Sequence, residues 1–234
     1  MRDEGSCTCE EARFTPPDDV LVSALTNSTN GVILVLDRDG IVRSPETESW
    51  RAGPDDYDWQ VGQAYTEPMP AHMAAERSRV AAEAIERYEP RRLIGMMRGR
   101  LVATSFVPFG PKNDPCLVVC TASCTVDWVE GAADVIAERF ATTHDLGEFS
   151  RLSGRELEVL SLLGRGMSNE QIAQQLHRSI RTVHGHRLAL GTKLASDSRV
   201  ELARVAINSG LARLPLEYVN RVWQGSRSET GGRR

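Results

Sequence analysis

The side chains best suited to chemistry in this sequence lie on one predicted helix near the C-terminus, residues 180–194. Arg181, His184 and Arg187 recur at intervals of three, so they share one helical face. Gly185 lies in the same face, where its lack of a side chain allows close approach to a groove. Guanidinium and imidazole groups placed in this way can hydrogen-bond to the base edges or phosphates of a nucleic acid. The free amides and positive dipole end at the start of such a helix also attract phosphate.

No set of residues typical of catalysis accompanies this face. The sequence contains no glycine-rich phosphate loop, no Gly-x-Ser-x-Gly elbow and no His-Glu-x-x-His pair, so we expect a protein that is not an enzyme. Three of its five cysteines, Cys116, Cys120 and Cys124, are spaced by four residues. An extended strand would spread their sulfurs about 13 Å apart per step, which is too wide for one metal ion. We therefore predict no metal site and expect the cysteines to be small core residues.

Three helix starts position the basic face. Ser153 and Glu156 have the spacing of a capping box, and Ser168 with Gln171 repeats it. Ser179 is predicted to cap the helix that presents the basic face. The helices expected from these signals cover residues 154–165, 169–176, 180–194 and 198–209. The second and third are joined by a short turn at 177–179 and form a helix-turn-helix.

Several motifs run through these helices at fixed spacings. They are Leu-Ser-x-Arg-Glu-x-Glu-Val-Leu at 152–160, Gly-x-Ser-Asn-x-x-Ile-Ala-x-x-Leu at 166–176, Ser-x-x-Thr-Val-x-x-His at 179–186, Lys-Leu at 193–194 and Arg-x-x-Leu at 199–202. Together they resemble the LuxR/FixJ-type DNA-binding domain, over about a quarter of the chain. The sequence departs from this family after Thr182-Val183, where His184 takes the place of the usual Lys or Arg. The target DNA sequence therefore stays open.

The resemblance implies that helix 180–194 enters the major groove of double-stranded DNA. It also implies that the fourth helix pairs subunits into a homodimer and that RNA polymerase is a partner. The residues expected to face bases are His184, Gly185, Arg187 and Leu188. Those expected to face phosphates are Ser168, Asn169, Ser179, Arg181, Thr182 and Lys193. Those expected to form the dimer contact are Val200, Ala203 and Ile207.

The charge is unevenly distributed along the chain, whose net charge is −4. Residues 1–149 contain 14 Lys and Arg against 25 Asp and Glu, whereas residues 150–214 contain 10 against 5. This asymmetry favours binding of a polyanion by the basic domain. Hydrophobic residues make up 41% of the sequence and charged residues 26%, which is typical of a globular protein. With no long apolar stretch and no secretory signal, we expect a cytoplasmic protein.

The acidic part of the chain is predicted to form an α+β domain over residues 20–125. Strands are expected at 31–36, from 41, and in an antiparallel meander at 92–97, 101–109 and 116–123, after a helix at 71–88. The segment Asn30-Gly-Val-Ile-Leu-Val-Leu-Asp-Arg-Asp-Gly-Ile-Val42 and the Pro-Phe-Gly-Pro turn before the last strand resemble PAS sensor domains. That resemblance implies a sheet with one face folded over a pocket. A GAF-like or other sensor fold is the alternative, and the pattern of a phosphorylation receiver is absent.

The segment between the two domains is predicted to be a helix over 126–141, followed by a polar linker. Its residues Val129, Ala133, Ile136 and Phe140 fall at spacings of 4, 3 and 4, like a short coiled-coil seam. This stripe can either pair two subunits or pack on the chain's own sensor sheet. A signal that releases it from the sheet would then favour the DNA-bound dimer.

The sequence thus predicts an α+β PAS-like antiparallel sheet domain followed by an all-α four-helix helix-turn-helix domain. The expected organisation is a flexible arm at 1–19, a sensor domain at 20–125, a signalling helix and linker at 126–149, a DNA-binding domain at 150–214 with its motif at about 169–188, and a tail at 215–234. We expect a transcriptional regulator whose sensor domain modulates binding to promoter DNA. A sensor or metabolite-binding protein that uses the helical domain for protein docking is the alternative. The cofactor stays unknown, and His72, a candidate haem ligand, is expected to face solvent.

Overall fold

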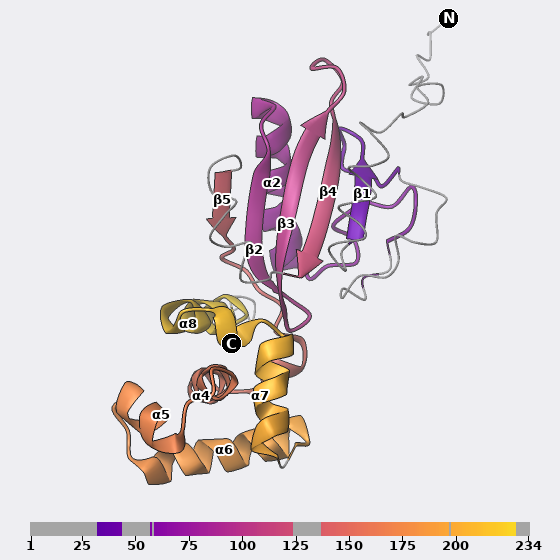
Figure 1. Cartoon of the computed structure of the whole chain (residues 1–234). Coiled ribbons are helices and arrows are strands. Elements are labelled where there is room, and N and C mark those ends of the chain that lie inside the picture. The colour runs from indigo at the N-terminus through magenta and orange to yellow at the C-terminus, as the bar shows by residue number, and fades with distance from the viewer. Residues whose placement is uncertain (1–31, 44–56, 58, 124–136, 197, 228–234) are drawn as a thin grey trace, which may run out of the picture.

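The computed structural model describes residues 32–43, 57, 59–123, 137–196 and 198–227. In this part of the chain a mixed five-stranded sheet comes first and a group of helices follows (Figure 1). The strands are β1 (Val32–Leu36), β2 (Arg91–Met97), β3 (Arg100–Phe109), β4 (Cys116–Ser123) and β5 (Ala137–Phe140). Their order in the sheet is β1-β4-β3-β2-β5. The predicted antiparallel meander β2-β3-β4 is confirmed, and β5 pairs with β2 in parallel.

The turn after β1 has the predicted conformation. Gly40 has a φ of 80°, in the left-handed region that glycine adopts without strain. Asp37 Oδ1 accepts hydrogen bonds from the amides of Asp39 and Ile41 at 3.0 and 2.9 Å, which fixes the turn from within. The returning strand is reduced to isolated bridges, one of which joins Ile41 to Ala64.

Helix α2 (Ala71–Arg87) covers one face of the sheet (Figure 1). Met73, Val80 and Ala84 lie on the predicted apolar stripe and are buried against the sheet core. His72 begins the helix as predicted, but it is half-buried rather than fully solvent-facing. Its Nε2 atom lies 3.4 Å from a backbone carbonyl oxygen of the segment that follows β5. The N-terminal part of α2 is therefore close to the junction between the domains.

The helical domain confirms the four predicted helices to within one residue at each end. They are α4 (Gly154–Gly164), α5 (Asn169–Gln175), α6 (Ile180–Leu194) and α7 (Arg199–Asn208), with α8 (Leu216–Gly225) and the short 3₁₀ helices η2 (Gly147–Arg151) and η3 (Leu211–Arg213) in addition. Leu157, Leu160 and Leu163 of α4 are at most 1% exposed. Helix α4 contacts α5, α6, α7 and α8, so it is the centre of this domain.

The sheet and the helices share one apolar core. Ile94 and Leu101 alternate with strand residues that face α2, so they lie on the opposite face of the sheet. There they belong to the same buried cluster as Phe149 and Val222. The amide of Leu101 also donates a hydrogen bond to the carbonyl oxygen of Ser209 at 2.8 Å. The two domains are thus packed together and not merely tethered.

The predicted helix over 126–141 is wrong at its C-terminal end. Residues 137–140 form strand β5, and residues 124–136 lie outside the described part of the chain. Phe140, the last residue of the predicted seam, packs against Tyr218 with 4.5 Å between ring centroids. Val129, Ala133 and Ile136 lie outside the described residues. A spacing of 4, 3 and 4 was a local signal that pairing with the distant strand β2 overrides.

The segment predicted to be a polar linker instead contains three buried side chains. His144, Leu146 and Phe149 are 1%, 2% and 1% exposed. The amide of Ala141 donates to a β2 carbonyl oxygen at 2.7 Å, and the amide of Asp145 donates to another at 3.0 Å. The chain therefore stays bonded to β2 until it enters η2 and the helical domain.

The segment predicted to be a C-terminal tail contains helix α8. Val219 and Val222 are fully buried against the helical core. Trp223 donates a hydrogen bond from Nε1 to the carbonyl oxygen of Leu152 at 3.1 Å. Its ring lies over Gly154, where a Cβ atom would stand 3.2 Å from the indole. The helical domain thus extends beyond residue 214.

Two structural features are absent from the described residues. No helix there is long and apolar enough to cross a membrane. No group of three or more His, Cys, Asp and Glu side chains is placed there to hold a metal ion. Cys116 and Cys120 are half-buried in β4, and Cys124 lies outside the described residues.

Removal of α8 should destabilise the protein. We expect a chain that ends after Leu214 to lose about 3 kcal/mol or more of unfolding free energy, because two fully buried valines each contribute about 1.5–3 kcal/mol. Urea unfolding followed by circular dichroism measures this loss, and a chain that ends after Arg227 is the matched control. Equal urea midpoints for the two chains would show that α8 does not stabilise the fold.

Candidate nucleic-acid interface

Helix α6 is held in place by its cap and by its buried face. Ser179 Oγ accepts a hydrogen bond from the amide of Thr182 at 3.1 Å, so the predicted N-cap is confirmed. Val183 and Leu190 are 1% and 0% exposed and pack into the helical core. These two constraints fix both the start and the rotation of α6, so its remaining face points away from the core.

The outward face of α6 is open to solvent. Apart from Gly185, its two chain neighbours and the nearby backbone of α6, no heavy atom of the described residues lies within 4 Å of the position that a Cβ atom on Gly185 would take. Another molecule can therefore approach the backbone closely there. The exposed fraction of Leu188 is 57%, although leucine is usually buried. Arg187 is half-buried, and its Nη2 atom lies 3.4 Å from Nδ1 of His184. The exposed residues of this face are Arg181, Thr182, His184, Gly185 and Leu188.

The residues expected to face phosphates gather at the starts of α5 and α6. Ser168 Oγ accepts from the amide of Gln171 at 3.2 Å, and Gln171 Oε1 accepts from the amide of Ser168 at 2.7 Å. The predicted capping box is therefore present, with half-buried Asn169 as its next residue. Helix starts present backbone amides and the positive end of the helix dipole, which favour an anion.

Lys193 differs from the rest of the phosphate-facing set. Its ammonium group donates to Glu156 Oε2 at 2.6 Å, and the same oxygen accepts from the amide of Ser153 at 2.7 Å. Burial raises the pKa of Glu156, but the bonds from Lys193 and Ser153 outweigh burial and hold this pKa below its usual value. Lys193 thus ties α6 to the start of α4, and a phosphate contact would have to compete with this ion pair.

An apolar surface runs along α7. Val200 and Ile207 are 76% and 47% exposed, and half-buried Ala203 lies between them. These three residues, which we predicted to pair subunits, line one shallow hollow together with Leu163, Gly166, Arg199 and Arg204. Exposed apolar surface of this kind is typical of a contact site.

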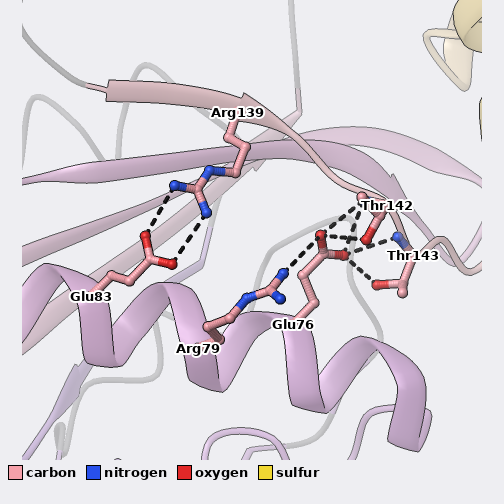
Figure 2. Close-up of polar contacts among 6 residues, drawn as sticks. All are labelled: Glu76, Arg79, Glu83, Arg139, Thr142 and Thr143. Atoms are coloured by element: carbon pink, nitrogen blue, oxygen red, sulfur yellow. Dashed lines mark hydrogen bonds and ion pairs between the residues drawn. The ribbon is translucent and has the colours of Figure 1, made fainter.

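Glu76 links the sheet domain to the segment that enters the helical domain (Figure 2). Its carboxylate is buried on α2 and accepts hydrogen bonds from the amides of Thr142 and Thr143, both at 2.9 Å, and from both threonine hydroxyl groups. Burial raises the pKa of Glu76, but these bonds lower it more, so the pKa lies below its usual value. A second link joins the Arg139 guanidinium to Glu83 of α2 at 3.0 and 3.3 Å.

His144 lies at the same junction and is neutral at pH 7. Burial is the main cause that lowers its pKa to about 4, and the charge of Arg77 adds to the effect against the opposing charge of Glu76. Its Nδ1 atom accepts from the amide of Met96 at 3.2 Å. Gly95 makes this approach possible, because a Cβ atom there would stand 2.8 Å from Ala141 Cβ and 3.2 Å from His144 Nδ1.

This junction has no recognisable signal in the sequence. Thr142, Thr143 and His144 form a short polar run that is typical of a linker, and their partners lie 48 to 67 residues earlier in the chain. The turn of the helix-turn-helix also contains a backbone conformation that the sequence did not predict. His177 has a φ of 53°, a conformation that non-glycine residues seldom adopt.

Loss of the α6 cap should affect DNA binding more than helix content. We expect Ser179→Ala to cost about 1 kcal/mol of stability and to weaken DNA binding further, because the same helix end is expected to face phosphate. Thermal unfolding and fluorescence anisotropy with duplex DNA measure the two effects. Ser78→Ala, an exposed serine within α2, is the control. An unchanged melting temperature together with unchanged DNA affinity would show that Ser179 neither stabilises the fold nor supports DNA binding.

The helical domain is similar in sequence to known bacterial regulatory proteins. Residues 150–206 match the family model for bacterial regulatory proteins of the luxR family. Oxygen regulatory protein NreC of Staphylococcus aureus (strain JH9) is 39% identical over 70 residues, which are 30% of this chain and 32% of NreC, so the match spans about a third of that relative's length.

Two solved structures are similar over different lengths of the chain. The dimeric LuxR-type receptor VqmA of Vibrio cholerae is 18% identical, with 87% of this chain and 93% of that chain covered and a TM-score of 0.40. A domain of an HTR-like protein from Haloarcula marismortui is also 18% identical, with 42% and 100% covered and a TM-score of 0.35. Taken with the family match, the capped helices and the solvent-open face of α6 identify residues 150–206 as a helix-turn-helix domain of the luxR family of bacterial regulatory proteins.

Proposed function

We propose that this protein is a transcriptional regulator that inserts α6 into the major groove of promoter DNA. The observation that supports this most is the contrast between the two sides of α6. Val183 and Leu190 fix one side in the core, whereas Arg181, His184 and Leu188 stand in solvent on the other. An α-helix held in this way has the size and the donor groups needed for the major groove. The protein acts on DNA by binding and not by catalysis.

The proposal includes a homodimer. Helix-turn-helix dimers read two half-sites about one DNA turn apart, and the apolar surface of Val200, Ala203 and Ile207 on α7 is available to pair two copies. A neutral histidine offers one donor and one acceptor, so His184 contributes more to base selection than to phosphate attraction. Contact with RNA polymerase at the promoter follows from the family resemblance.

We further propose that the N-terminal domain is a PAS-like sensor that modulates DNA binding. Two features support coupling between the domains. Sheet residues and helical residues share one core, and Glu76 of α2 holds the backbone of Thr142 and Thr143, just before the chain enters the helical domain. A displacement of α2 would therefore move Thr142 and Thr143, and with them the segment that leads into the helical domain.

The DNA-binding part of the proposal predicts a strong salt dependence. We expect the full chain to bind duplex genomic fragments with an affinity that falls steeply as salt rises, because phosphate contacts release counterions. If Arg187 reads a base, Arg187→Ala should cost about 1–3 kcal/mol and relax the preference at one position. Fluorescence anisotropy measures both, and Arg221→Ala, an exposed arginine on α8, is the control. A protein that binds no fragment at low salt would instead use this domain for docking to another protein.

The proposed coupling between the two domains predicts that a substitution in α2, far from the DNA, changes DNA binding. Glu76→Gln keeps the side-chain shape but replaces one acceptor oxygen with a donor, so we expect a loss of about 1.5–3 kcal/mol in stability. Hydrogen exchange should speed up over residues 142–149, and the DNA affinity of the full chain should change. Glu86→Gln, at an exposed position on α2, is the control. Wild-type exchange over 142–149 in Glu76→Gln would exclude this link as the coupling route.

A further inference from the structure

Arg77 of α2 is a fully buried arginine inside the sheet domain. Its exposed fraction is 1%, and it is among the largest fully buried side chains of the described residues. Met73 lies four residues before it, and Val80 and Ala84 lie three and seven residues after it, so all four share one helical face. Met73, Val80 and Ala84 pack into the core between α2 and the sheet. The guanidinium group is therefore directed into an apolar core and not toward solvent.

Arg77 has no hydrogen-bond partner at two of its nitrogen atoms. Among the residues that the structure describes, nothing accepts from Nε or Nη1, although both atoms are buried. Two carboxylates of the described residues around the domain junction are already bonded elsewhere: Glu76 accepts from Thr142 and Thr143, and Asp145 accepts from the Tyr57 hydroxyl and the Gly147 amide. A buried charge without a partner is costly and rare, and the described residues supply no acceptor for these two nitrogen atoms of Arg77.

The same core contains a run of aromatic rings. Tyr57 and Trp59 are 5.6 Å apart between centroids, Trp59 stacks on Tyr65 at 5.9 Å, and Tyr65 meets the edge of Phe106 at 6.2 Å. The positive charge of Arg77 influences the ionisation of Tyr57 and of His144, so Arg77 lies near one end of this run and near the domain junction. Trp59 is half-buried, so the run reaches toward the surface.

We propose that Arg77 anchors a ligand site in the sheet domain that takes a small organic carboxylate with an apolar or aromatic body. A carboxylate supplies both the missing acceptor atoms and the missing negative charge, and its two oxygens suit the planar guanidinium group. A neutral carbonyl compound would leave the charge unpaired. The aromatic run would pack against the ligand body. This inference rests on the proposed function, because it names the class of signal that the sensor domain receives.

The site lies beside the link to the DNA-binding domain. Arg77 follows Glu76 directly on α2, and Glu76 holds Thr142 and Thr143. A carboxylate drawn to Arg77 would add negative charge close to the buried Glu76 carboxylate and to neutral His144. Ligand binding and the junction would thus be coupled through one turn of α2.

Benzoate, benzamide and acetate test the chemistry of the site on the full chain at constant ionic strength. Benzoate has both charge and ring, benzamide only the ring, and acetate only the charge. A ligand that binds the folded state raises the melting temperature in a saturable way, and we expect this for benzoate at concentrations up to about 20 mM. Benzamide and acetate should require at least about tenfold higher concentrations, a factor that corresponds to the loss of one charged contact. No saturable shift with benzoate, or an equal shift with benzamide, would overturn the proposal.

Arg77→Met separates a ligand anchor from a structural residue. We expect this variant to lose the benzoate shift and, without ligand, to melt at or above the wild-type temperature, because it removes an unpaired buried charge. A variant that unfolds or melts clearly lower would show that Arg77 has its partner within the protein, and the proposal would fall. Arg79→Met is the matched control: Arg79 lies two residues further on α2 with 61% of its side chain exposed, and its variant should keep the benzoate response.

The melting experiments contain no DNA, so their result does not depend on whether the proposed function is correct. Benzoate binding through Arg77 without any DNA binding would overturn only the proposed regulator. DNA binding with normal salt dependence but no benzoate response would overturn only the carboxylate site. A benzoate response that persists in Arg77→Met would place the ligand elsewhere and would also overturn the site.

Discussion

The backbone hydrogen bonds between β2 and residues 141–145 determine where the helical domain lies. Strand β5 pairs with β2 in parallel, and the bonds from Ala141 and Asp145 continue that pairing to the end of the strand. From there the chain has only a few residues before Phe149 enters the core that α4 organises. The position of α6 therefore depends on the sheet, because the segment that joins the sheet to the helical domain is short and is hydrogen-bonded to β2.

Two adjacent residues of α2 show how differently the fold treats buried charge. The Glu76 carboxylate is fully satisfied by amide and hydroxyl donors, which is why its pKa stays low despite burial. The Arg77 guanidinium is equally buried, yet two of its nitrogens are unsatisfied within the described residues. Structural charges are normally paired, whereas charge left unsatisfied is more often found where a ligand completes it. The first residue is suited to holding the fold together and the second to the carboxylate ligand that we propose.

The parts of the fold that could be predicted from sequence are those fixed by local signals. The boxes at Ser153 and Ser168 and the cap at Ser179 each depend on atoms within three residues, so they located α4, α5 and α6 to within one residue. The outward face of α6 followed from helical periodicity once Val183 and Leu190 were assigned to the core.

Distant contacts explain what could not be predicted. The four residues of β5 pair with a strand more than 40 residues earlier, and an apolar spacing of 4, 3 and 4 does not reveal such a partner. The Glu76 and His144 contacts are equally remote in sequence. Helix α8 is different, since the helical spacing of Leu216, Val219 and Val222 is visible in the sequence. Arg77 could not have been singled out, because a lone arginine in an amphipathic helix is usually a surface residue.

The shared core also bears on what happens when the chain is cut. Ile94 and Leu101 of the sheet cover part of the surface that Phe149 and Val222 present. A protease that removed the sheet domain would leave that apolar surface in water, and the released fragment would be less stable than the intact chain. The DNA-binding domain therefore depends on the sheet domain for its own persistence. Damage to the sheet domain would therefore also destabilise the helical domain that is joined to it.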